Sequence, residues 1–139
     1  EGQGAGQVRD ELVYSLDIPA TVMAGTGVEP VGAIEGQSLL PLVEGGDGFE
    51  ARDYVTCRYG NSVWYRDDRT WFFSRGDFSG ARVFDLEADP DCQVDIAEGA
   101  EDRIGLARER ILADAGGDIP IYVRQNATDA LGRPVFAEE

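Results

Sequence analysis

The stretch from residue 53 to residue 86 constrains the fold most, because its side chains alternate with a period of two. Four segments in it are rich in aromatic and β-branched residues, as strands are. They are DYVTCRY (53–59), SVWYR (62–66), TWFFSR (70–75) and ARVFDL (81–86). Gly60-Asn61 and Asp67-Asp68 stand where hairpin turns are expected, and residues 76–80 form a longer loop. The pattern predicts an antiparallel meander of four strands.

One face of such a sheet must be covered, and the segment after the meander supplies a helix. Apolar residues recur there at spacings of three and four, so we predict a helix over about residues 101–115. The apolar positions are Ile104, Ala107, Ile111 and Leu112. Gly116-Gly117 ends the helix, and Ile119–Val123 is a candidate fifth strand. The predicted fold class is α+β, a four-stranded antiparallel sheet covered by a C-terminal helix.

The first 52 residues have a different character. Asp17 is placed to cap a short helix that runs to Ala24, with Gly25 and Gly27 stopping it. Ile18, Val22 and Met23 share one face of this helix, which therefore needs a partner surface. The remainder is loop, apart from an apolar knot over residues 39–43 that Ser38 precedes as a possible cap. We predict two regions, residues 1–52 and residues 53–139.

Charge excludes several classes of function. Twelve basic residues, all arginine, face 27 acidic ones, and the net charge is −15. Such a chain repels phosphate backbones and anionic lipids, so we expect no nucleic-acid or membrane partner. The sequence contains no histidine and no lysine, which removes the commonest general base and Schiff-base chemistry. No apolar run approaches the roughly 20 residues that span a bilayer.

Several clusters have both a functional and a structural interpretation. An acidic run resembles the start of a calcium-binding loop, but Pro90 and Ile96 replace its glycine and glutamate, which favours a structural turn. The run consists of Asp85, Glu87, Asp89, Asp91 and Asp95. Four arginines of the meander, Arg58, Arg66, Arg69 and Arg75, either bind an anion or pair with acids of the chain. Its aromatic residues form a sugar-stacking platform or the core. Cys57 and Cys92 are interpreted as unpaired thiols. The residues themselves predict no catalytic group and no metal ligand.

Three segments, in order, resemble the C-terminal end of sulfatases of the alkaline-phosphatase superfamily. They are LVYSLDIPATVMAGTGV (12–28), IEGQSLLPLVEG (34–45) and VFDLEADPDCQVDIAE (83–98). In that family the α/β catalytic domain ends in a segment like LVSLVDLxPTLLDLAGI. A DGxSLxPLL loop, a four-stranded antiparallel sheet, LYDLxxDPxExxNLA and a final helix follow it. The sequence departs from these patterns at Ala20-Thr21, Cys92, Asp95 and Trp71-Phe72.

The resemblance implies that the chain is the C-terminal portion of a sulfatase-type hydrolase. The short N-terminal helix is then the edge of the catalytic domain, which is the expected partner of this chain. The calcium ion, the formylglycine nucleophile of a C/S-x-P-S-R motif and the assisting His and Lys residues of the family belong to that missing domain. The chain alone is expected to be inactive and to help shape the substrate cleft.

The first hairpin supplies the expected rim of that cleft, through Arg58, Tyr59, Asn61 and Trp64. The alternative is that these four are ordinary surface and core residues of the hairpin. Two other functions stay open. The chain is a stand-alone interaction or carbohydrate-binding module, or it is the same portion of a related phosphodiesterase or phosphonate hydrolase.

Overall fold

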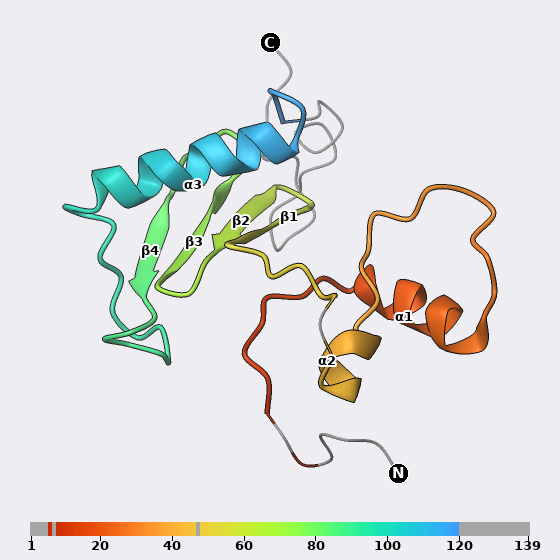
Figure 1. Cartoon of the computed structure of the whole chain (residues 1–139). Coiled ribbons are helices and arrows are strands. Elements are labelled where there is room, and N and C mark those ends of the chain that lie inside the picture. The colour runs from red at the N-terminus through yellow and green to blue at the C-terminus, as the bar shows by residue number, and fades with distance from the viewer. Residues whose placement is uncertain (1–5, 7, 47, 120–139) are drawn as a thin grey trace. The chain divides into compact units, whose positions relative to one another are not determined.

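The computed structural model describes residues 6, 8–46 and 48–119 of the 139-residue chain. It divides into two compact units, Glu1–Asp53 (unit 1) and Tyr54–Glu139 (unit 2). Figure 1 shows the elements of each unit. None of the described helices is long and apolar enough to cross a bilayer.

Unit 2 contains the predicted sheet. Four antiparallel strands follow one another in the order β1-β2-β3-β4. They are β1 (Val55–Tyr59), β2 (Ser62–Arg66), β3 (Thr70–Arg75) and β4 (Arg82–Asp85). Local chemistry sets the turns between them. Gly60 adopts a φ of 56° in the first hairpin, and the carboxylate of Asp67 accepts hydrogen bonds from the backbone N–H groups of Arg69 and Thr70 in the second.

Helix α3 (Glu101–Asp114) lies along one face of this sheet, as Figure 1 shows. The core forms between them, because alternate strand residues point toward the helix. Its fully buried apolar members are Val63, Phe72, Val83, Ala107 and Ile111. The helix ends where the Gly117 N–H bonds the Leu112 carbonyl at 2.7 Å. The α+β prediction, with four strands and a covering helix, is confirmed.

Unit 1 contains two short helices, α1 (Asp17–Thr26) and α2 (Leu40–Glu44). The predicted stop at Gly25 is wrong, because α1 continues through it and ends at Gly27, whose φ is 69°. Helix α2 occupies the predicted apolar knot, and the hydroxyl of Ser38 accepts a hydrogen bond from the Leu40 N–H at 3.2 Å. Gly36 is needed for close approach, since a Cβ there would lie 2.1 Å from the Leu16 carbonyl oxygen.

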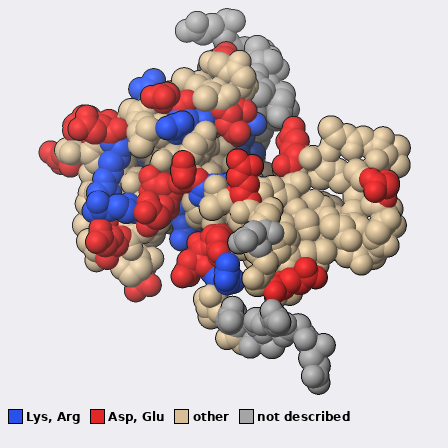
Figure 2. Space-filling model, in the orientation of Figure 1, with Lys and Arg blue, Asp and Glu red and all other residues tan. Residues whose placement is uncertain are grey.

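The described apolar side chains of unit 1 are either exposed or half-buried. Among its described residues Asp17 alone is buried, and no apolar side chain is. On α1, Ile18 is 60% exposed and Val22 is 58% exposed. Figure 2 shows that acidic side chains crowd the surface of unit 2, whereas the surface of α1 and the loop after it is largely uncharged in this view. Unit 1 therefore holds its shape without an apolar core of its own.

The candidate fifth strand lies outside the described residues from Pro120 onward. Its first residue, Ile119, is buried and belongs to the core cluster of unit 2.

Candidate functional site

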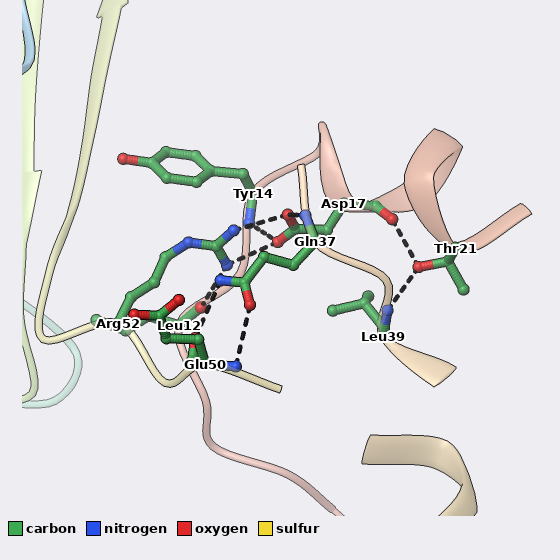
Figure 3. A network of polar contacts seen from close by, with 8 residues as sticks. All are labelled: Leu12, Tyr14, Asp17, Thr21, Gln37, Leu39, Glu50 and Arg52. Atoms are coloured by element: carbon green, nitrogen blue, oxygen red, sulfur yellow. Dashed lines mark hydrogen bonds and ion pairs between the residues drawn. The ribbon is translucent and has the colours of Figure 1, made fainter. Parts of the chain in front are cut away.

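A polar network in unit 1 is built around Asp17, the first residue of α1 (Figure 3). Oδ1 of Asp17 accepts hydrogen bonds from the Gln37 N–H and from Arg52, each at 2.8 Å. Oδ2 accepts from the Tyr14 N–H and again from Arg52, also at 2.8 Å. The Asp17–Arg52 pair is therefore bidentate, and we call it the Asp17–Arg52 clasp. Asp17 is fully buried, and Arg52 is largely so.

The predicted role of Asp17 as a helix cap is wrong. The helix begins at Asp17 itself, and Leu16 before it makes no side-chain cap. Asp17 therefore belongs to the first turn of the helix. Its carboxylate accepts a hydrogen bond from the Tyr14 N–H, which precedes the helix, and not from the free backbone N–H groups of the first turn. The guanidinium of Arg52 and the Gln37 N–H occupy the rest of its acceptor capacity.

Further contacts of the network hold three segments of unit 1 together. The Gln37 side chain exchanges two hydrogen bonds of 3.0 Å with the backbone of Glu50. The Thr21 hydroxyl donates to the Asp17 carbonyl and accepts from the Leu39 N–H. These bonds connect α1, the loop before α2 and the segment that carries Arg52, as Figure 3 shows.

The surroundings of Arg52 complete the clasp. Its guanidinium carbon lies 5.1 Å from the centre of the Tyr14 ring and 5.8 Å from that of Phe49, in cation–π geometry. Burial raises the pKa of the Asp17 carboxyl, but hydrogen bonds from Arg52, Gln37 and Tyr14 outweigh it and hold that pKa below its usual range. A carboxylate that is ionised and has four donors has no capacity left for a substrate. The clasp is structural.

The four residues predicted for a cleft rim separate onto two faces of the sheet. Arg58 points to the α3 side, where it pairs with Asp114 at 3.2 Å beside the hydrogen bond of Thr56 to the same carboxylate. Tyr59 and Trp64 occupy the opposite side by strand alternation, and they are 80% and 39% exposed. The structure brings Tyr59 and Trp64 to one face and places Arg58 on the other.

Asn61 lies in the turn between β1 and β2. Its carbonyl accepts the Gly76 N–H at 2.9 Å, which ties this turn to the β3–β4 loop. Its side-chain Oδ1 is buried and has no hydrogen-bond partner in the described structure. The role of the four residues at a substrate cleft stays a prediction.

The acidic run after β4 binds backbone N–H groups of its own loop. Asp85 accepts from the N–H groups of Glu87 and Ala88 and pairs with Arg103 at 2.7 Å. The Arg103 hydrogen bond is the main reason that the pKa of Asp85 lies below its usual range. Asp89 accepts the Val94 N–H at 2.7 Å across five residues, which is not the two-residue spacing of an Asx turn; the bond from the Glu87 N–H to Asp85 has that spacing. Residues 6, 8–46 and 48–119 contain no group of three or more acidic or Cys side chains placed to hold a metal.

Both cysteines are free thiols, as predicted. Cys57 is exposed, and Cys92 is half-buried in a turn with a φ of 53°. Burial is the main cause that raises the pKa of Cys92, and the Asp89 carboxylate adds to it. Neither cysteine begins a C-x-P-S-R sequence, so neither fits the formylglycine position of the sulfatases. The described residues also do not fit a calcium site.

The chain is similar to known proteins in its three-dimensional fold, not in its sequence. No family model and no curated protein matches the sequence. The phosphonate monoester hydrolase of Agrobacterium radiobacter superposes with a TM-score of 0.62 and 21% identity over 82% of this chain and 27% of that protein. The phosphonate monoester hydrolase of Silicibacter pomeroyi gives 0.65 and 16% over the same shares. BT1596, a 2-O GAG sulfatase, gives 0.56 and 21% over 72% of this chain and 23% of that one.

The chain thus spans about a quarter of the length of the solved structures it matches. Superpositions with these TM-scores, at 16–21% sequence identity, show that the fold is shared. The chain has the fold of a portion of known sulfatases and phosphonate monoester hydrolases, as the resemblance of its three segments implied.

Proposed function

We propose that this chain is the non-catalytic C-terminal portion of a larger hydrolase that cleaves sulfuric or phosphonic esters. The observation that carries the proposal is the likeness of 82% of this chain to about a quarter of such enzymes. The three sequence motifs support the C-terminal position. The calcium ion and the formylglycine that the sulfatase resemblance implies would then belong to the rest of the protein.

The exposed apolar surface of unit 1 supports a docking role for this chain. Monomeric proteins rarely expose large apolar surfaces unless something binds there. Exposed apolar side chains of unit 1 include Leu16, Ile18, Val22, Val28, Val31 and Val43. In the proposal, the catalytic portion of the same protein covers this surface. The Asp17–Arg52 clasp then fixes the shape that it covers.

Two ester classes compete, and one observation favours the second. The sequence motifs are those of sulfatases, so a sulfuric ester is the first candidate. The two phosphonate monoester hydrolases, however, superpose with TM-scores of 0.62 and 0.65, against 0.56 for the 2-O GAG sulfatase and 0.61 for a Bacteroides thetaiotaomicron structure designated 4S-sulf, which covers 94% of this chain. A phosphonate monoester is therefore the second candidate. The Tyr59–Trp64 side of the first hairpin is proposed to contribute to the cleft in either case.

Activity assays on two samples test the proposal. The samples are the purified 139-residue chain and the native gene product, captured from its source cells with an antibody against the chain. Both are incubated with 4-nitrophenyl sulfate and with 4-nitrophenyl phenylphosphonate. We expect turnover of one ester by the native product and of neither by the isolated chain. Turnover by the isolated chain, or inactivity of the native product on both esters, would contradict the proposal.

A further inference from the structure

The face of the sheet opposite α3 carries Trp64, which the proposed function sets beside the cleft, and five further side chains that the proposed function does not explain. We call it the aromatic–arginine face and define it by six outward side chains of β2, β3 and β4. They are Trp64, Arg66, Trp71, Phe73, Arg75 and Arg82. Strand alternation places them there, since their neighbours Val63, Tyr65, Phe72, Ser74 and Val83 are the buried residues on the α3 side.

Aromatic side chains lie side by side on this face. The rings of Trp64 and Phe73 have centres 6.4 Å apart and are inclined by 46°. Those of Trp71 and Phe84, an outward residue of β4 that is buried, are 5.4 Å apart. Trp64 remains 39% exposed and Phe73 half-buried, so part of this apolar surface is open. Large aromatic residues left open beside one another are typical of the centre of a protein interface.

The charge on the face is opposite to that of the chain. Every charged residue at an outward strand position of β2, β3 and β4 is an arginine, in a chain whose net charge is −15. The register sets Arg82 directly beside Phe73, and Arg66 directly beside Trp71. Within the described part of the chain, neither Arg75 nor Arg82 forms an ion pair. Arg75 donates a hydrogen bond to the Ser79 hydroxyl at 3.4 Å and lies near the Asp77 carboxylate. Arg66 lies near Cys92 together with Asp89 and Asp91.

We propose that the aromatic–arginine face binds a polypeptide surface that carries carboxylates beside apolar side chains. Arginine pairs with carboxylates through two parallel hydrogen bonds, and Arg82 has this capacity free, while Arg75 uses one N–H group on the Ser79 hydroxyl. Tryptophan, phenylalanine and arginine together are enriched at protein interfaces. The inclined rings of Trp64 and Phe73 do not form the flat platform that a sugar ring requires. The net charge of −15 also repels long polyanions. A small acidic patch on a protein, in contrast, interacts mainly with the arginines that it contacts.

Tryptophan fluorescence tests this proposal directly, because Trp64 and Trp71 are the only two tryptophans of the chain and both lie on this face. The full chain is titrated with three probes. One is a peptide of alternating Leu and Glu, the second replaces Glu by Lys, and the third is a heparin hexasaccharide. We expect saturable fluorescence change with the Leu–Glu peptide alone.

Matched variants assign the binding to Arg82 and to Arg75. Replacing both, Arg75→Gln with Arg82→Gln, is expected to weaken binding of the Leu–Glu peptide about tenfold. Arg108→Gln, which removes the same charge from α3, is expected to leave it unchanged. The proposal is overturned if the Leu–Lys peptide binds equally well, if the hexasaccharide binds more tightly than either peptide, or if no probe binds at millimolar concentration. It does not depend on the parent enzyme, so these outcomes are separate from the hydrolysis assays.

Discussion

The two units of this chain are stabilised in opposite ways. Unit 2 buries apolar side chains between a sheet and α3, with Val63, Phe72 and Ile111 fully enclosed. Unit 1 buries one charged residue, Asp17, and exposes the apolar side of α1. Burial of apolar surface stabilises a fold by itself, whereas a buried ion pair roughly offsets its own desolvation and mainly fixes geometry. We infer that unit 2 is stable alone and that unit 1 is shaped to be covered.

The largest expected effect follows from breaking the clasp. Arg52→Leu leaves the Asp17 carboxylate buried without its counter-charge, which typically costs about 3–5 kcal/mol. We expect α1 to lose its protection against hydrogen exchange while the strands and α3 keep theirs. Hydrogen-exchange mass spectrometry, read on peptides that cover residues 17–26 and 101–114, measures both units in one sample.

Arg69→Leu is the matched control for that experiment. Arg69 pairs with Glu87 at 2.8 Å, but both side chains are more than half exposed, so the pair is screened by solvent. We expect its exchange pattern to equal that of the original chain. If Arg52→Leu left α1 unchanged, the clasp would not be what holds unit 1 together.

Truncating the core of unit 2 gives the next effect. Ile111 on α3 is fully buried, and Ile111→Ala is expected to lower the free energy of unfolding of unit 2 by about 2–5 kcal/mol. Leu106 lies on the same helix but is 41% exposed, so Leu106→Ala is expected to cost less than about 1 kcal/mol. Denaturant titration followed by far-UV circular dichroism compares the two variants. Equal losses would contradict the assignment of the α3 faces.

Acid should open unit 1 through Asp17. Its pKa is lower in the fold than the ordinary value of about 3.9, so the ionised form stabilises unit 1 above that pH. This stabilisation is lost as the pH falls through the lowered pKa. We expect α1 exchange, corrected for intrinsic rates, to be constant from about pH 7 to about pH 4 and to rise below it. Asp17→Asn should abolish that pH dependence, and its persistence in the variant would assign it to another carboxyl.

The smallest expected effect is a change in stability, measured for the same Val→Thr substitution in each unit. Val63→Thr puts a hydroxyl into the core of unit 2 and is expected to cost about 1–3 kcal/mol. Val22→Thr changes a side chain on α1 that is 58% exposed, so the stability of the isolated chain should change by no more than about 0.5 kcal/mol. Thermal unfolding of the two variants provides the measurement. A large loss from Val22→Thr would mean that α1 is already covered.

The sheet and α3 were predictable from sequence because their signals are local. Alternation marks each strand, and SVWYR and TWFFSR coincide with β2 and β3 residue for residue. Helical spacing marks α3, whose predicted buried positions include Ala107 and Ile111. In these segments the same side chains specify local structure and tertiary burial, so a pattern of period two or about 3.6 is sufficient.

The clasp was not predictable in this way. Asp17 and Arg52 are separated by 35 positions, and no period connects them. Asp17 before Pro19 looks like a helix cap locally, and only the tertiary position of Arg52 makes the buried pair the better use of the carboxylate. The opposite faces of Arg58 and Trp64 were implied by strand alternation. Both residues were nevertheless predicted for one cleft rim, because they lie on the same hairpin.

The most direct test of the account is the intact mass of the native gene product. The 139-residue chain has a mass of 15.1 kDa. If this chain is the C-terminal portion of a larger hydrolase, antibody capture from source cells followed by intact mass spectrometry should find a product several times heavier. A native product of 15.1 kDa that sediments as a monomer would contradict the account, because the apolar side of α1 would then have no covering partner.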